Sequence, residues 1–433
     1  MRAMANSLKL PDEDPGKLRR SVVKPKGSAM SRRVCLFQGA FVARLSTALL
    51  AQSLSPSEID PQSLRRPLPT WNQAEHEFGF ANWDRIVSSR TIARGNQVHP
   101  LSEGTPLPTF SPGGDGAKQL QRSIDNYKLA GIVVLHNDKL RLERYALGHS
   151  AGGRWVSFSV AKSLTSTLVG AAIKDGYISS IDDVVTRYIP ELRDSAYDGV
   201  TVRQLLTMTS GTKWNEDYTD VKADVALMYS TTVDSGMDAT VSYMRKLTRD
   251  AVPGQKWHYN TGDTNLIGVV VALATKKDLA TYASEKIWAR YGMERDASWM
   301  LDRTGHEQGG CCMQATTRDY ARFGQFILDG ARIDGQSIVV DGWLEAATRK
   351  QVDIGQPGSG DGCQWWTRDN GPFNAMGLHG QQIHIDPARR LVVAINSAWP
   401  VAEFTEESLP ARVALLDAIR AAIDSESRSN SGK

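Results

Sequence analysis

The sequence predicts a mixed α/β fold in which an antiparallel sheet, flanked by helices, is built from both ends of the chain. Strand-like segments occur within residues 130–145 and again within 365–396, whereas residues 182–299 have the apolar spacing of helices separated by glycines. Strands far apart in sequence can share one sheet if the chain between them forms its own lobe. We therefore expect a sheet part over about 118–181 and 300–425, with an inserted helical part over about 182–299.

The first two strands are expected to form a hairpin after a polar, Gly- and Pro-rich linker at about 100–117. Residues 130–136 are mainly apolar, and residues 139–145 alternate apolar and charged side chains. Asn137 and Asp138 between them are typical turn residues. The pattern therefore places two antiparallel strands side by side.

The later elements are read from helix spacing and turn residues. A helix begins at Ser159 and ends near Gly176, where glycine is a typical C-cap, and residues 316–330 repeat this pattern. A turn signal at 386–389 separates two strands. An amphipathic helix over about 408–423 is expected to close the fold.

The two ends of the chain are expected to contribute little to the core. Residues 1–70 are rich in Ser, Pro, Arg and Lys, residues 426–433 form a polar tail, and residues 71–425 make up the folded domain. Residues 30–51 are basic and then moderately apolar, as in a secretory signal. Polar and charged residues interrupt that apolar run, so a cytoplasmic location is favoured over export to the periplasm or beyond.

Composition and charge exclude several function classes. The 433 residues are 41% hydrophobic and 23% charged, with a formal net charge of +3, which is typical of a globular protein. Much of the positive excess precedes residue 67, so the globular part lacks the basic surface of a nucleic-acid-binding protein. Four cysteines make no disulfide framework, and eight histidines show no metal-binding spacing, so no metal or cofactor is expected. No segment predicts a transmembrane helix.

Ser159 and Lys162 carry the strongest chemical signal. They stand three residues apart at the start of an apolar helix, so hydroxyl and amine share one face within hydrogen-bond reach. Serine needs a neighbouring base to become a nucleophile, and a desolvated lysine can be neutral enough to accept its proton. The helix N-terminus favours negative charge beside Ser159. Ser21 and Lys24 have the same spacing, but no apolar helix follows them, and we interpret that pair as accidental.

Further segments follow the Ser159 helix in a fixed order. They lie at residues 182–192, 200–211, 257–262, 266–268, 377–381 and 385–387. This series resembles the class C β-lactamase-related serine hydrolases over about residues 120–425. It is most similar to the 6-aminohexanoate-dimer hydrolases, the nylon-oligomer amidases, at Trp214-Asn-Glu-Asp-Tyr218, Gln364-Trp-Trp366 and Gly377-Leu-His-Gly-Gln381. The resemblance implies a β-lactamase/penicillin-binding-like fold.

The resemblance also implies a third catalytic group. Tyr259 occupies the place of the tyrosine in the family's Tyr-x-Asn motif. A phenol whose pKa is lowered by Lys162 can shuttle a proton between Ser159 and the leaving group. Thr261 stands where the family has asparagine, which departs from a β-lactamase, and it is counted among the substrate-binding candidates. The alternative interpretation of Tyr259 is a loop tyrosine that only packs beneath the rim of the site.

Residues 377–381 lie where penicillin-recognising relatives have Lys-Thr-Gly. The likeness implies that the main-chain amide of Leu378 joins that of Ser159 in an oxyanion hole, where each donor contributes on the order of 3 kcal/mol. The two glycines of the segment are expected to let the strand approach the substrate closely. His379 is a candidate substrate contact, whereas a role as catalytic base is disfavoured because the base roles are already filled.

Aromatic residues supply the remaining substrate-binding candidates. Tyr218 matches the tyrosine that covers the substrate amide in the nylon-oligomer hydrolases, although an aromatic lid over any cleft would show the same pattern. Trp365 and Trp366 either line the acyl pocket or pack the sheet, and packing is favoured for at least one of them. The adjacent Cys311 and Cys312 are interpreted as small buried residues behind the site.

The absence of Lys-Thr-Gly decides among the activities that the resemblance implies. Its lysine attracts a substrate carboxylate in β-lactamases and peptidases, and the tripeptide does not occur in this chain. We therefore expect a serine hydrolase that cleaves amide or ester bonds of small-molecule substrates through an acyl-enzyme. β-Lactamase or DD-peptidase activity is the enzymatic alternative. A catalytically silent penicillin-binding-like domain that binds a ligand or a partner is the alternative from another class.

Overall fold

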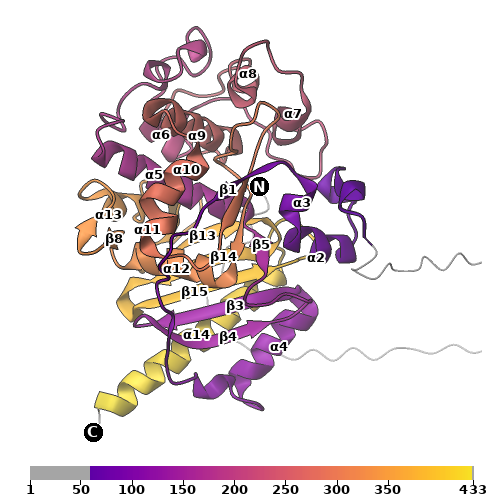
Figure 1. The fold of residues 1–433 in the computed structure, drawn as a ribbon, viewed down its shortest axis with the longest axis vertical. Coiled ribbons are helices and arrows are strands. Elements are labelled where there is room, and N and C mark those ends of the chain that lie inside the picture. Colours follow the sequence, from indigo (N-terminus) through magenta and orange to yellow (C-terminus); the bar gives the residue numbers. More distant parts are fainter. Residues whose placement is uncertain (1–58, 432–433) are drawn as a thin grey trace, which may run out of the picture.

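A nine-stranded sheet forms the centre of the computed structural model, which describes residues 59–431; the predicted signal segment at 30–51 lies outside the described residues. Neighbouring strands pair antiparallel except β2 and β4, which are parallel (Figure 1). In sheet order the strands are β10 (Val352–Asp353), β11 (Ser359–Asp361), β12 (Trp366–Arg368), β13 (Phe373–Gly377), β14 (Gln381–Asp386), β15 (Leu391–Ser397), β3 (Leu129–His136), β4 (Lys139–Tyr145) and β2 (Ser102–Glu103).

A second, four-stranded antiparallel sheet leads the chain to Ser159. Its strands, in spatial order, are β1 (Ser89–Ile92), β6 (Ala297–Met300), β7 (Met313–Thr316) and β5 (Arg154–Val156). The strand β5 ends three residues before Ser159, so this sheet anchors the start of the Ser159 helix. A small hairpin, β8 (Arg332–Ile333) and β9 (Gln336–Ser337), stands apart from both sheets.

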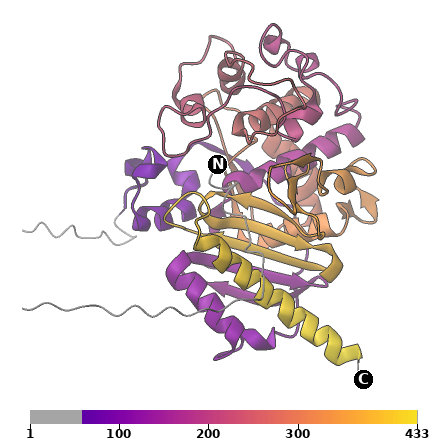
Figure 2. The same cartoon turned by 180° about the vertical axis from the view of Figure 1, so that it is seen from behind.

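Helices cover both faces of the large sheet. On one face α4 (Asp115–Tyr127) and α14 (Ser408–Ser431) pack on apolar side chains of β3 and β15, and Figure 2 shows α14 crossing the sheet. On the other face α12 (Thr317–Leu328) packs against the same two strands. The layers bury both faces of the central strands, which explains why β3 and β15 are almost entirely apolar.

The helical lobe is organised around two long helices that pack on each other, α5 (Ala161–Lys174) and α9 (Thr261–Thr275). Both are almost wholly buried, and Asn260 caps α9 by accepting a hydrogen bond from the Asp263 amide. The shorter helices are α2 (Gln73–Ala81), α3 (Trp83–Ile86), α6 (Val202–Leu206), α7 (Asp224–Ser230), α8 (Ala239–Met244), α10 (Leu279–Ala283), α11 (Ala289–Tyr291) and α13 (Trp343–Ala347).

The predicted fold class, an antiparallel sheet flanked by helices, is confirmed. The predicted hairpin is β3 and β4, and its turn residues Asn137 and Asp138 both have positive φ, 51° and 60°. The predicted helices after Ser159 and Thr316 are α5 and α12. Between residues 59 and 431, no helix combines the length and apolar character needed to span a bilayer.

Two expectations about the N-terminal half are wrong. Residues 59–70 do contribute to the core, because the Asp60 side chain caps a short 3₁₀ helix that buries Leu64 beneath Trp71. The linker was expected to run to about residue 117 and to lead straight into the hairpin. Instead the helix α4 begins at Asp115, within that range, and buries Leu120 and Ile124 on one face. The i, i+4 spacing of those two side chains is the signal for this helix in the sequence.

Candidate active site

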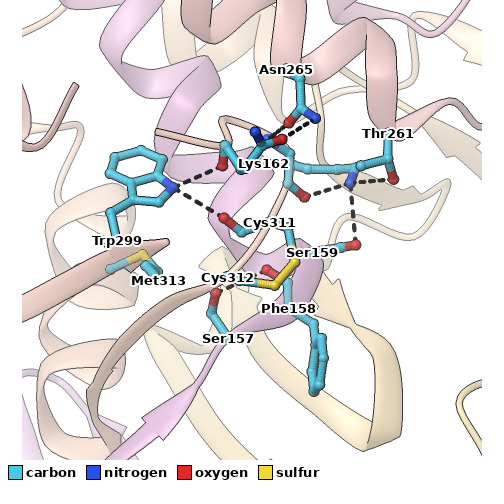
Figure 3. The surroundings of a disulfide bond; sticks show 12 residues. Ser157, Phe158, Ser159, Lys162, Thr261, Asn265, Trp299, Cys311, Cys312 and Met313 are labelled. Atoms are coloured by element: carbon cyan, nitrogen blue, oxygen red, sulfur yellow. Dashed lines mark hydrogen bonds between the residues drawn. A yellow bond between two sulfur atoms is a disulfide. The ribbon is translucent and has the colours of Figure 1, made fainter. Parts of the chain in front are cut away.

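Ser159 lies in a 3₁₀ turn, η5 (Phe158–Val160), between strand β5 and helix α5. The next turn of the chain carries Lys162, and α9 begins beside it with Thr261 (Figure 3). Ser159 is 8% exposed and Lys162 is 3% exposed. The structure therefore brings the predicted nucleophile and base together in a site almost closed to water.

Three oxygens surround the ammonium group of Lys162. Lys162 Nζ lies 3.2 Å from Ser159 Oγ, 2.9 Å from Thr261 Oγ1 and 2.6 Å from the Gly310 carbonyl oxygen (Figure 3). Burial lowers the pKa of Lys162 to about 8, and the nearby charge of Glu216 limits that decrease. A lysine with this pKa exists partly as the free amine near neutral pH, so it can accept the Ser159 proton.

Glu216 is a site residue that sequence reasoning missed. It is 5% exposed, and its carboxylate accepts hydrogen bonds from the Thr261 amide (2.9 Å), the Thr261 hydroxyl, the Tyr218 phenol (2.5 Å) and the Trp214 indole. Thr261 thus donates to Glu216 while it accepts from Lys162. Thr261 therefore positions Lys162, and the substrate contact expected of it stays a prediction. The acidic residue stood within the Trp214–Tyr218 motif, but only the fold brings it to Thr261.

Tyr259 is buried against both the lysine and a tryptophan. Lys162 Nζ lies 5.1 Å from the centre of its ring, and Trp366 stacks on the ring with centroids 5.8 Å apart. Burial and the charge of Glu216 raise the pKa of Tyr259 well above its usual value, although a hydrogen bond with Ser159 opposes this. The expectation that Lys162 lowers this pKa is wrong, because a lysine buried at the same depth is itself shifted toward its neutral form. The phenol therefore stays protonated.

The loop that carries Gly310 is held by side chains from two directions. Asn265 accepts a hydrogen bond from the Gly310 amide (2.7 Å), and the Trp299 indole donates to the Gln308 and Cys311 carbonyls (Figure 3). Cys311 and Cys312 are joined by a disulfide that was not predicted from the sequence, while Cys312 is buried in an apolar cluster and Cys311 packs against it, as expected for small buried residues. The backbone turns sharply at this pair, where Cys312 has a φ of 70°.

The end of β13 abuts the turn that carries the nucleophile. A Cβ added at Gly377 would lie 2.4 Å from the Ser157 carbonyl oxygen and 3.1 Å from the Ser159 amide nitrogen. Glycine is therefore required at 377 for contact between two stretches of backbone, rather than for approach of a substrate as expected. Gly380 has a φ of 85° and faces the Trp399 ring, so its role is also structural. Leu378 follows directly after the contact with the Ser159 turn.

His379 points into an aromatic cluster. Its φ of 55° turns the ring toward His76 (4.7 Å between centroids), Phe80 (5.0 Å) and Phe158 (5.5 Å). Its Nδ1 lies 2.7 Å from the Trp399 carbonyl oxygen, and burial lowers its pKa to about 3. The expectation that His379 contacts substrate does not fit this position, because the left-handed backbone directs its ring into the core.

The remaining aromatic candidates separate into two groups. Trp365 is fully buried between Phe323 and Phe373, which confirms that at least one of the paired tryptophans packs the core. Trp366 instead stacks on Tyr259, and the half-buried Tyr218 donates to Glu216. Trp366 and Tyr218 therefore lie in the wall of the Ser159 site.

Potential metal ligands lie elsewhere in the part of the chain that the structure describes. Among residues 59–431, Asp238, Asp302 and His306 form the one group of three such side chains whose ligand atoms lie within 4.8 Å of each other. His306 Nδ1 pairs with Asp238 at 2.8 Å, and this hydrogen bond raises the pKa of His306. The group shares no residue with the Ser159 site.

Comparisons with known proteins identify the family. The beta-lactamase family model matches residues 118–418, well over half of the chain. The 6-aminohexanoate-dimer hydrolase of Paenarthrobacter ureafaciens is 28% identical over 77% of this chain and 88% of its own.

Solved structures show the same fold. A Bacillus anthracis protein provisionally described as a 6-aminohexanoate-dimer hydrolase superposes with a TM-score of 0.70 at 23% identity, covering 81% of this chain and 94% of its own. A family VIII carboxylesterase superposes with a TM-score of 0.57 at 15% identity, covering 74% of this chain and 99% of its own. The chain belongs to the beta-lactamase family and is a serine hydrolase.

Proposed function

We propose that this serine hydrolase cleaves esters and linear amides of small molecules through an acyl-enzyme on Ser159. The observation that carries the proposal is the buried Lys162 amine, 3.2 Å from the Ser159 hydroxyl and with its pKa lowered to about 8. A neutral amine at this distance is a base that can activate serine without a histidine.

Acylation begins when Lys162 takes the proton of Ser159. The serine oxygen attacks the substrate carbonyl carbon, and the carbonyl π electrons move onto its oxygen. The main-chain amides of Ser159 and Leu378 then donate to this oxyanion, each contributing on the order of 3 kcal/mol to its stabilisation. The contact between Gly377 and the Ser159 turn supports this pairing of amides.

Tyr259 is assigned as the proton donor to the leaving group. Its raised pKa keeps the phenol protonated, which suits an acid, and the interaction with Ser159 that opposes this rise supports a position beside the reacting oxygen. After the amine or alcohol departs, Lys162 returns the proton to Tyr259. Water then attacks the acyl-enzyme carbonyl by the same proton transfers, with Lys162 as base, and the carboxylic acid product leaves Ser159.

Three observations support esters and linear amides as the substrate class. The chain has no Lys-Thr-Gly lysine to anchor a carboxylate beside the scissile bond. Tyr218 donates a hydrogen bond from its phenol to Glu216, so the phenol oxygen retains lone pairs that can accept a hydrogen bond from a substrate amide N–H. The similarity to a 6-aminohexanoate-dimer hydrolase adds support for linear amides.

The test compares kcat/KM for a short p-nitrophenyl ester, the linear 6-aminohexanoate dimer and a chromogenic cephalosporin. Wild type should prefer the ester and the linear amide over the cephalosporin. Tyr259→Phe should reduce amide hydrolysis far more than ester hydrolysis, because nitrophenolate leaves without a proton and an amine does not. Tyr218→Phe should lower amide hydrolysis alone.

Three results would count against the proposal or a part of it. A cephalosporin preferred over the ester would indicate a β-lactamase. Equal losses on ester and amide in Tyr259→Phe would assign that phenol to positioning. Absence of turnover on all three substrates, together with no covalent labelling of Ser159, would indicate a silent binding domain.

A further inference from the structure

A cavity shares Trp366 with the wall of the Ser159 site. It has a volume of about 880 Å³ and is enclosed by the outer strands β12 to β14 and by α14, the helix that crosses this face in Figure 2. Trp366 lines the cavity and also stacks on Tyr259. Ser159, Lys162, Tyr259 and Leu378 do not line it, so the cavity and the Ser159 site share Trp366 but none of the proposed catalytic groups.

The cavity wall carries an excess of positive charge. Arg389 and Arg420 pair with Asp424 and Asp417, the two carboxylates of the wall. Two further guanidinium groups lie in the wall, and their hydrogen bonds go to neutral oxygens. Arg368 donates to Ser359 Oγ (2.7 Å), and Arg412 donates to Gln382 Oε1 (3.0 Å), to the Gly380 carbonyl and to Ser397 Oγ (both 3.1 Å).

No ion pair of Arg368 or Arg412 occurs between residues 59 and 431, and Arg412 is only 5% exposed. A buried guanidinium without a carboxylate is costly unless an anion balances its charge. The cavity wall therefore has two cations more than it has anions.

A buried histidine in the same wall lacks one hydrogen-bond partner. His384 on β14 is 3% exposed, and its Nδ1 lies 2.8 Å from Asn374 Oδ1. Its Nε2 is enclosed and has no partner in the described part of the chain. The Nδ1–H donates to the Asn374 oxygen, so the Nε2 of the neutral ring is an acceptor that faces no donor, and it supplies no contact to an anion.

Another part of the cavity wall is apolar. Met376, Phe404, Leu409 and Val413 line it, and they belong to one cluster of packed side chains. A volume of this size is typical of small-molecule sites that combine apolar walls with a few polar groups. The occupant that matches both parts is a molecule with one anionic end and one hydrocarbon end.

We propose that this cavity binds a small aliphatic carboxylate, with its carboxylate at Arg368 and Arg412 and its chain against Met376 and Phe404. This inference does not depend on catalysis by Ser159, because no catalytic residue lines the cavity.

Isothermal titration calorimetry of the full chain with octanoate, octanol and inorganic phosphate tests the proposal. Octanoate should bind at least about tenfold more tightly than either octanol or phosphate, because only octanoate satisfies both parts of the wall. Arg368→Gln should weaken octanoate binding at least about tenfold. The matched control is Arg349→Gln, since Arg349 is 72% exposed and pairs with Glu345 away from the cavity.

Val413→Trp supplies a second variant, because it fills the apolar part without removing a charge. It should weaken octanoate and leave the melting temperature within a few degrees of wild type. Octanoate affinity unchanged in both Arg368→Gln and Val413→Trp would overturn the proposal. Octanol or phosphate binding as tightly as octanoate would overturn it as well. Ser159→Ala should bind octanoate as tightly as wild type, because Ser159 does not line the cavity, and a clear loss of affinity in this variant would place the ligand at the hydrolytic site.

Discussion

The two walls of the hydrolytic site contribute different chemistry. The helix wall, formed by α5 and α9, supplies side chains, with Lys162 held between Ser159 and Thr261. The strand wall, at the end of β13, supplies backbone, and its one ionisable side chain, His379, turns away into the core. A substitution therefore damages the helix wall by removing a functional group and damages the strand wall by adding atoms.

The largest effect should come from the helix wall. Lys162→Ala removes the base, so kcat/KM for a p-nitrophenyl ester should fall by roughly 10³-fold or more. Lys174→Ala, at the exposed end of the same helix, is the matched control and should retain activity. A loss of less than about tenfold in Lys162→Ala would mean that another group activates the serine.

The strand wall should be sensitive to a single added methyl group. Gly377 has a φ of −137°, which any residue adopts, so Gly377→Ala acts only through the collision of its Cβ with the Ser157 carbonyl oxygen. We expect kcat to fall by about 10²-fold, as when one oxyanion donor is misplaced. Gly152→Ala, where the new Cβ would meet its nearest neighbour at 3.5 Å, is the control. An unchanged kcat in Gly377→Ala would contradict the proposed role of the strand wall in stabilising the oxyanion.

A smaller effect should appear as a shift in pH dependence. The proposed mechanism uses the neutral amine, so kcat/KM should rise with pH and level off above the Lys162 pKa of about 8. Glu216 raises that pKa by its negative charge, so Glu216→Gln should move the midpoint to lower pH. Glu345→Gln, at an exposed residue, should leave the profile in place. A midpoint that moves upward, or does not move, would contradict the electrostatic role of Glu216.

The smallest catalytic effect is expected at His379. His379→Asn keeps a residue that tolerates positive φ but removes the hydrogen bond to Trp399 and the packing on His76. Unfolding free energy should fall by about 1–3 kcal/mol, measured by chemical denaturation, while kcat/KM changes by less than about fivefold. A loss of activity comparable with that of Gly377→Ala would indicate that His379 contributes to substrate binding or catalysis.

The sequence was a good guide to the helix wall and a poor one to the strand wall. Ser159 and Lys162 lie one helical turn apart, so local spacing is enough to predict their contact, and the structure brings them within 3.2 Å. His379 could not be placed in the same way, because the positive φ that turns its ring depends on packing against residues about 300 positions earlier.

Properties that depend on burial were also beyond the sequence. The direction of the Tyr259 pKa shift follows from the depth of the site and from the charge of Glu216, a residue that the fold brings to the site. The disulfide between Cys311 and Cys312 depends likewise on how the Gly310 loop turns. The predicted fold class needed only apolar periodicity and the order of the segments, and it was confirmed.

The most direct test of the account is intact-mass analysis after reaction with an alkyl fluorophosphonate. Wild type should gain the mass of one adduct, and peptide mapping should locate it on Ser159. Ser159→Ala, with an unchanged circular dichroism spectrum, should gain none, and Lys162→Ala should react far more slowly than wild type. An adduct that persists in Ser159→Ala, or that maps to Ser21, would contradict the assignment of Ser159 as the nucleophile.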